Sequence, residues 1–379
     1  MKIIISFFIF CLVLFIYLHI QFHLKTSNDL EIYEIDDVSK DKLEEICDLR
    51  QPVLFDYDNE KIIQSTNSRF ILENYPAFEM KIRNINETDT NTELYINLPL
   101  HASDKLFRED KTSTYFSENN SDFLNETGVI KNFKYNDEYL RPYMVSNLNY
   151  DIMLGSSGTR TPFRYEVNYR NYFLCSEGSL QIKMTPPRSI KYLYPEYDYE
   201  NFEFRSPVNP WKVQTKYAAD FEKIKCLEVQ LTKGKMIYIP AYWWYSIKFI
   251  GNNTSISCFR YRTYVNNLAI TPYISMHILQ LQNIKRDVTK KISIDVLKNK
   301  VNLDENHSEN HSENHDENHS ENHNENHSEN HNVNNESKSE IYFQTTTYIN
   351  DLQNNDNQNV SKEDPKPAME YENFGAEIN

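Results

Sequence analysis

The sequence predicts a mainly β fold, a barrel or sandwich with flanking helices, preceded by one transmembrane helix. Three observations support this prediction. Between about residues 30 and 290, short runs of β-branched and aromatic residues alternate with turn sequences such as Ser-Glu-Gly, Thr-Lys-Gly and Gly-Asn-Asn, which is typical of an all-β domain. Residues 3–24 are almost entirely apolar, and residues 291–379 are polar and acidic.

The apolar segment at residues 3–24 is long enough to span a bilayer as a helix, which takes about 20 residues. A cleaved signal peptide is the alternative, but the apolar run is long and no small-residue cleavage site follows it. We therefore favour an uncleaved single-pass anchor behind a short tail at residues 1–2. Acidic residues dominate positions 29–37, so the positive-inside rule favours an exoplasmic or lumenal body.

The C-terminal region is distinguished by its charge. Residues 301–379 hold 18 acidic and 3 basic side chains and so carry the whole net charge of −15. Residues 305–332 repeat a tetrapeptide of the Glu-Asn-His-Ser type seven times, without one apolar residue. Such a segment cannot bury enough surface to offset the entropy lost on ordering, so residues 291–379 are predicted to be disordered. The rest of the chain is neutral and has no basic run, so no nucleic-acid partner is expected.

Residues 30–290 are predicted to form one domain. Strands are expected at residues 48–56, 68–74, 78–85 and 93–100, and in further runs between 149 and 265. Helices are expected at Ala102–Arg108, with Ser103 as the cap, and at Tyr115–Asn125. The apolar residues of 273–285 predict a final helix that packs on the barrel or on a second subunit, which would form a homodimer.

Several motifs of this domain occur in the order typical of one superfamily. They are LRQPVLF at 49–55, TPFRY at 161–165, NYFLCSEGSLQIKMTPP at 171–187, and LEVQLTKGKMIYIPAYWWYSI at 227–247. With these motifs, residues 43 to about 283 resemble the cupin-like branch of the JmjC superfamily, which includes asparaginyl and lysyl hydroxylases. The resemblance implies a double-stranded β-helix, the jelly-roll barrel of cupins, with flanking helices.

The resemblance also implies where a metal site would lie. In active members an HxD pair and a distant histidine hold Fe(II), with open positions for 2-oxoglutarate and oxygen. By position, the pair corresponds to Arg164 and Glu166, and the distant histidine to Tyr245. A guanidinium has no accessible lone pair, and a tyrosine binds a metal only as phenolate, so one good ligand of three remains. In the predicted domain the histidines are His101 and His277, neither of them on a pocket strand.

The cosubstrate position is altered as well. Where hydroxylases carry the lysine that binds 2-oxoglutarate, the resemblance places Leu180, and Lys183 on the same strand faces the other side by alternation. Thr161 and Asn171 correspond to pocket-lining positions, and Trp244 is a further pocket candidate for which packing is the simpler role. No metal and no cofactor are therefore expected, with Fe(II) and 2-oxoglutarate as the alternative.

Two hypotheses describe what replaces the metal. Arg164 and Glu166 share one strand face, so the arginine is expected to neutralise the carboxylate while Tyr245 donates its hydroxyl to it. This trio would be a structural plug, or, more plainly, polar core. The alternative keeps a pocket open, in which Arg164, Arg260 and Arg262 receive a carboxylate, phosphate or sulfate.

The sequence thus predicts a membrane-anchored, catalytically inactive cupin-like protein that acts as a binding or scaffold module. A protein or peptide partner is expected at the aromatic loop of residues 192–211. The first alternative is an Fe(II)/2-oxoglutarate-dependent oxygenase, a protein hydroxylase or demethylase, with an atypical ligand set. The second is a lumenal accessory protein that handles carbohydrate, suggested by the anchor and the aromatic loop.

Overall fold

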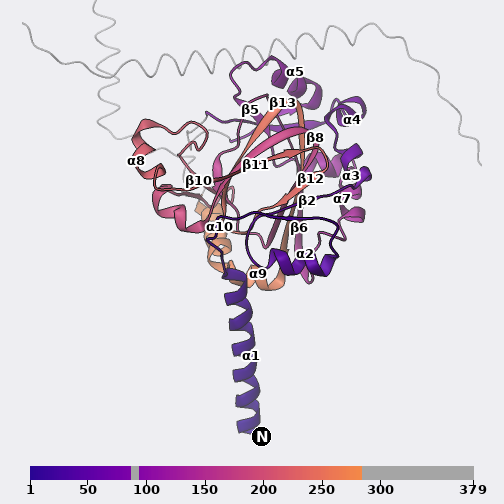
Figure 1. Ribbon diagram of the computed structural model, residues 1–379. Coiled ribbons are helices and arrows are strands. Elements are labelled where there is room, and N and C mark those ends of the chain that lie inside the picture. Colours follow the sequence, from indigo (N-terminus) through magenta and orange to yellow (C-terminus); the bar gives the residue numbers. More distant parts are fainter. Residues whose placement is uncertain (87–93, 284–379) are drawn as a thin grey trace, which may run out of the picture. The chain divides into compact units, whose positions relative to one another are not determined.

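The computed structural model describes residues 1–86 and 94–283. The predicted disordered tail at 291–379, its repeat, and the last two residues of the predicted helix at 273–285 lie outside the described residues. Figure 1 shows a long N-terminal helix, α1 (Lys2–Leu24), that leads into a body in which helices surround a set of strands.

The strands of the described residues form one continuous hydrogen-bonded sheet, with a main path β1-β2-β12-β8-β13-β6-β5-β3-β4 and with β7, β9, β10 and β11 off this path. Their bounds are β1 Tyr33–Ile35, β2 Val53–Asp56, β3 Glu79–Asn84, β4 Ile96–Pro99, β5 Tyr115–Ser117, β6 Val145–Gly155, β7 Phe163–Tyr165, β8 Arg170–Thr185, β9 Glu196–Asp198, β10 Glu203–Ser206, β11 Leu227–Thr232, β12 Lys235–Tyr238 and β13 Trp244–Thr263.

Two long strands, β8 and β13, organise the barrel. They pair antiparallel along most of their length, with a register shift between Ile250 and Ser255. The first half of β8 also pairs with β12, and the second half of β13 also pairs with β6. On the other side of the shift, the second half of β8 pairs with β11, and the start of β13 pairs with β7. Each long strand therefore has different neighbours on the two sides of the shift and contributes to two walls of the barrel, which is the jelly-roll arrangement that the sequence predicts. The predicted fold class is confirmed.

Side chains alternate along these strands and place one face in the core. On β8 the buried file is Leu180, Ile182 and Met184, and on β13 the residues opposite are Phe249, Ile247 and Tyr245. The apolar core ends at Tyr245, because the residue paired with it on β7 is Arg164. Beyond this point the interior is lined with charged and polar side chains.

Helices and short 3-10 turns cover the outside of the sheet. Their bounds are α2 Lys40–Cys47, α3 Glu60–Ser65, α4 Ser68–Asn74, α5 Leu100–Glu109, α6 Ser121–Glu126, α7 Ile130–Asn136, η1 Pro187–Tyr192, η2 Thr215–Tyr217, α8 Ala218–Phe221, α9 Tyr264–Ala269 and α10 Thr271–Asn283. The predicted final helix is thus present as α10 within the described residues.

Three local predictions before residue 130 are wrong. Residues 68–74 form helix α4, not a strand, because the side chain of Asn67 caps it by accepting hydrogen bonds from the first backbone N–H groups. Ser103 does not cap α5: the helix begins three residues earlier, and the Ser103 hydroxyl donates to the carbonyl of Pro99 at 3.1 Å. The helix predicted at Tyr115–Asn125 divides into β5 and α6.

Helix α1 is a candidate membrane anchor by length and composition, a test that an N-terminal signal sequence would also pass. Its last turn packs against the body. The ring of His23 is buried against Tyr169, and its Nε2 lies 3.1 Å from the hydroxyl oxygen of Thr263, the residue before α9. The guanidinium of Arg50 lies over the ring of Phe22, a cation at the carbonyl end of the helix dipole. The end of α1 is therefore fastened to the domain.

Candidate functional site

A cavity of about 310 Å³ lies where the apolar core of the barrel ends. Strand β7 contributes Arg164 to its lining, β10 contributes Glu203, and β13 contributes Arg260 and Arg262. The remaining wall consists mainly of asparagine and aromatic side chains. The cavity therefore includes two of the three positions that correspond to metal ligands in the sequence, Arg164 and Glu166.

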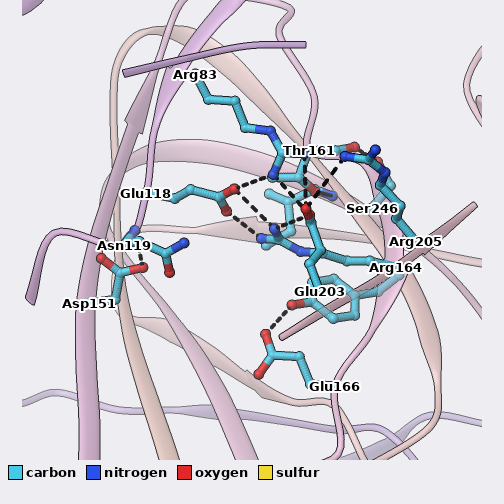
Figure 2. A network of polar contacts seen from close by, with 12 residues as sticks. Arg83, Glu118, Asn119, Asp151, Thr161, Arg164, Glu166, Glu203, Arg205 and Ser246 are labelled. Carbon is cyan, nitrogen blue, oxygen red and sulfur yellow. Dashed lines mark hydrogen bonds and ion pairs between the residues drawn. The ribbon is translucent and has the colours of Figure 1, made fainter. Parts of the chain in front are cut away.

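Arg164 is held by two carboxylates from elsewhere in the chain (Figure 2). Its Nη1 donates to Glu118 Oε1 at 3.0 Å and to Glu203 Oε1 at 3.1 Å, and its Nη2 donates to Glu118 Oε2 at 2.5 Å. Arg83 on β3 binds the same pair, with Nη1 2.9 Å from one oxygen of each. Two guanidinium groups and two carboxylates thus form an ion cluster, and Nη1 of Arg205 adds a longer contact of 3.8 Å to Glu203 Oε2.

The cluster is almost fully enclosed, with side chains of Arg83, Glu118, Arg164 and Glu203 between 1% and 8% exposed. Burial by itself would raise the pKa of Glu118, but the positive charges of Arg164 and Arg83 outweigh burial and lower the pKa to about 2. The carboxylate is therefore ionised at neutral pH. Charges of this kind are tolerated in an interior because each has a partner.

Glu166 belongs to a second, adjacent network. The hydroxyl of Tyr245 donates to its Oε1 at 2.5 Å, and Nε of Arg260 lies 3.1 and 3.0 Å from its two oxygens. The amide of Asn168 donates to Oε2 at 2.8 Å. Burial opposes ionisation of Glu166, but Arg260 and then Arg164 lower its pKa overall. Burial, followed by the charge of Glu166, raises the pKa of Tyr245, so its phenol stays protonated.

The plug predicted from the sequence is present in part. The hydrogen bond from Tyr245 to Glu166 exists as expected. The partner that neutralises Glu166, however, is Arg260 of β13, whereas Arg164 is occupied by Glu118 and Glu203. Strand alternation placed Arg164 and Glu166 on the same face, but it does not determine which carboxylate a long side chain reaches.

Three members of the ion cluster were not predicted from the sequence: Arg83, Glu118 and Glu203. Each is a charge close to apolar residues in the sequence: Arg83 follows Ile82 in Lys-Ile-Arg-Asn, Glu118 follows Tyr-Phe-Ser, and Glu203 lies between two phenylalanines. A charge in such a setting signals a buried partner somewhere, but the sequence does not indicate which one. Strands β3 and β10, which carry Arg83 and Glu203, and the end of β5, which precedes Glu118, come together only in the folded sheet.

The other pocket candidates lie away from the cavity wall. Thr161 accepts a hydrogen bond from the backbone N–H of Ile247 at 3.0 Å, and Asn171 donates to the carbonyl of Ile239 at 3.3 Å, so both fasten neighbouring strands. Leu180 is fully buried in the barrel core, and Trp244 packs in a second apolar cluster.

Arg262 differs from the other two arginines of the anion-pocket hypothesis. Arg164 and Arg260 each bind carboxylates, Arg260 adding Asp151 at 3.4 Å. Arg262 donates through Nε to Asn168 at 2.6 Å and lies over the ring of Phe202, and among the described residues it has no carboxylate partner. Burial lowers its pKa. An anionic ligand in this cavity would therefore meet one guanidinium without an ion-pair partner among the described residues, not three.

The residues at the three metal-equivalent positions do not fit Fe(II). They present a guanidinium in an ion cluster, a carboxylate whose two oxygens already accept four hydrogen bonds, and a protonated phenol. Within residues 1–86 and 94–283, no group of three or more His, Cys, Asp or Glu side chains is arranged to hold a metal ion. His101 lies at the start of α5, and His277 on α10 contacts the carbonyl of Tyr199.

A family model described as a cupin-like domain matches residues 28–267. The chain belongs to the cupin-like domain family. The superfamily resemblance predicted from its motifs is thereby confirmed.

Curated relatives of this cupin-like chain match shorter segments. JmjC domain-containing protein D of Dictyostelium discoideum is 29% identical over 111 residues, which covers 29% of this chain and 24% of that protein. HSPB1-associated protein 1 is 26% identical over 100 residues both in Bos taurus and in Homo sapiens, covering 26% of this chain and 21% or 20% of the relative. The chain thus aligns with about a quarter or less of each relative's length.

Proposed function

We propose that this cupin-like protein is a membrane-anchored, non-catalytic binding module. The observation that supports the proposal most directly is the side chain of Arg164, which stands at a metal-equivalent position and is bound by Glu118 and Glu203. A cation at this position would be repelled by the guanidinium. Moving the guanidinium aside would leave two buried carboxylates short of a partner, a change that costs about 3–5 kcal/mol.

The cosubstrate position supports the same proposal. Leu180, which corresponds to the 2-oxoglutarate-binding lysine, is fully buried among apolar side chains. Lys183 points away from the core: its ammonium lies 3.4 Å from Glu228 and over the ring of Trp211. No step of iron or 2-oxoglutarate chemistry is therefore assigned to this barrel.

The cavity mouth is the surface that we propose for a protein or peptide partner. Its rim carries the exposed amides of Asn147 and Asn149 on β6 and the guanidinium of Arg262, which has no ion-pair partner among the described residues. Amide and guanidinium groups in this arrangement suit a peptide backbone or an acidic side chain. The name of the relatives called HSPB1-associated protein 1 describes an association with another protein. For this chain, binding of a protein or peptide partner is part of the proposal.

The first experiment tests for oxygenase activity. The full chain in detergent is incubated with Fe(II), ascorbate and 2-oxoglutarate, and succinate is measured against the Glu166→Gln variant. We expect no succinate above the heat-denatured control in either protein. Because the histidines of residues 305–332 would bind metal equally in both proteins, bound metal counts only as a difference between them. Succinate formation or metal binding that requires Glu166 would contradict the proposal and restore the oxygenase alternative.

The second experiment tests anchoring and orientation. We propose a single-pass anchor with an exoplasmic or lumenal body, supported by the length and composition of α1. Four asparagines in Asn-X-Ser/Thr glycosylation sequences are also exposed on the body: Asn86, Asn119, Asn125 and Asn253. The chain should resist extraction from membranes by alkaline carbonate and should shift in mass after endoglycosidase treatment. A carbonate-resistant chain without glycans would place the body on the cytoplasmic side.

A further inference from the structure

A second cavity, distinct from the barrel mouth, is lined by positive charge. It has a volume of about 240 Å³ and lies between η1 and the segment after α8. We call it the basic groove; its charged lining residues are Arg188, Lys191, Lys223 and Lys225. All four side chains are exposed, and no carboxylate is among the lining residues.

Three of these four cations have no acidic partner in the described part of the chain. Lys223 forms an ion pair with Asp220 at 2.8 Å, whereas no carboxylate lies within ion-pair distance of Arg188, Lys191 or Lys225. Folding therefore gathers like charges that repel one another across a narrow space. An arrangement of this kind is stabilised when an anion enters it.

The walls of the basic groove are fixed by hydrogen bonds and by an aromatic ring. The hydroxyl of Thr185 donates to the carbonyl of Lys225 at 2.9 Å and lies 2.7 Å from the hydroxyl of Ser189, which ties η1 to the opposite wall. The ring of Tyr192 carries the ammonium of Lys191 at 4.8 Å and that of Lys223 at 5.4 Å. Two of the four ammonium and guanidinium groups, those of Lys191 and Lys223, are thus held against the same ring.

The groove lies close to the end of the anchor helix. The backbone N–H of Arg188 donates to the side chain of Asn28 at 3.0 Å. Asn28 follows Leu24, the last residue of α1, by four residues, a stretch that spans at most about 14 Å. Because His23 and Arg50 fasten the end of α1 to the body, the groove has a fixed position near the helix end.

We propose that the basic groove binds the phosphate groups of an anionic phospholipid in the membrane that α1 spans. The inference rests on the proposed anchoring by α1 and adds a ligand to it. It does not rest on the proposed lumenal orientation: anionic phospholipids are concentrated in the cytoplasmic leaflet, so lipid retention by the groove would favour a cytoplasmic body. Phosphate oxygens accept hydrogen bonds from guanidinium and ammonium groups, and lysines close to an anionic membrane surface attract its lipids. The groove would hold the body against the bilayer and so orient the barrel mouth relative to the membrane.

The test uses the full chain in nanodiscs that contain equal amounts of phosphatidylcholine and phosphatidylinositol bisphosphate. Lipids retained on the protein after transfer to detergent are identified by native mass spectrometry. The variant is Lys191→Ala/Lys225→Ala, and the matched control is Lys61→Ala/Lys131→Ala, which removes two exposed lysines from α3 and α7. We expect wild type and control to retain the anionic lipid preferentially, and the groove variant to lose about 25-fold in preference, about fivefold per lysine.

Three outcomes would overturn the inference. One is no preference for the anionic lipid over phosphatidylcholine, and another is equal retention in the groove variant and the control. The third is displacement of the lipid by an equal concentration of inositol trisphosphate, which would identify a soluble phosphate compound as the ligand. Carbonate extraction separates the two proposals: a chain that stays in the membrane without lipid preference refutes the groove alone, and an extracted chain refutes the anchoring.

Discussion

The ion cluster of Arg83, Glu118, Arg164 and Glu203 and the basic groove use the same residue types in opposite ways. In the cluster every charge is buried and paired with opposite charges inside the protein. In the groove the cations are exposed and mostly unpaired. A charge that is enclosed by partners contributes to the native structure, whereas one that lacks them is available to a ligand.

The largest expected effect comes from opening the cluster. In Arg164→Ala, Glu118 and Glu203 lose a guanidinium while they stay buried, so the free energy of unfolding should fall by about 3–5 kcal/mol. Denaturant unfolding of the full chain in detergent, followed by near-UV circular dichroism, measures the change. In the control Arg108→Ala, which removes a half-exposed pair with Asp104, the loss should stay within about 1 kcal/mol. Equal losses in both variants would show that the cluster is not a special determinant of stability.

The next effect appears on acidification. Because the arginines lower the pKa of Glu118 to about 2, the unfolded chain takes up a proton at a higher pH than the folded chain. The stabilisation is therefore complete above about pH 4.5, the ordinary value for the group, and is lost as the pH falls toward 2. In Glu118→Gln the free energy of unfolding at neutral pH should be lower than in wild type. It should also fall less than in wild type as the pH is lowered. An identical loss in both proteins would assign the acid sensitivity to other carboxylates.

A smaller effect is expected in the adjacent network around Glu166. Tyr245→Phe removes one of the donors to Glu166, while Arg260 and Asn168 remain. A buried carboxylate that loses one donor should destabilise the fold by about 1–3 kcal/mol. The control is Tyr143→Phe, since the exposed hydroxyl of Tyr143 also donates to a carboxylate, Asp41, and its removal should change little. No difference between the two variants would indicate that solvent replaces the lost donor of Glu166.

The fold could be predicted because its determinants are local and repeated. Alternation along β8 and β13 marks the buried file from Leu180 to Met184 and from Tyr245 to Phe249 directly in the sequence. One of the errors fell where a single capping side chain decides the outcome. Asn67 turns residues 68–74 into helix α4 although their composition suits a strand.

The site could be predicted only in part because its partners come from distant elements. The bond between Tyr245 and Glu166 followed from positions that the resemblance had already placed on facing strands. Glu118 and Glu203 lie 46 and 39 residues from Arg164 in the chain, and no spacing rule connects them. The basic groove was missed for the same reason, because η1 and the segment after α8 are separate in sequence and each carries only a few charges.

The smallest effect on stability is expected in the basic groove. This prediction gives the most direct test of the difference between the groove and the ion cluster. Lys191→Ala/Lys225→Ala removes exposed side chains without an acidic partner, so the free energy of unfolding should change by no more than about 0.5 kcal/mol, and a slight gain is consistent with less repulsion. Lipid preference should fall in the same variant and should weaken in wild type as salt rises, because exposed charges are screened over about 10 Å at 0.1 M salt. The enclosed cluster should lose little stability over the same range of salt. If salt instead weakened the fold and spared lipid binding, the assignment of one region to stability and the other to binding would have to be reversed.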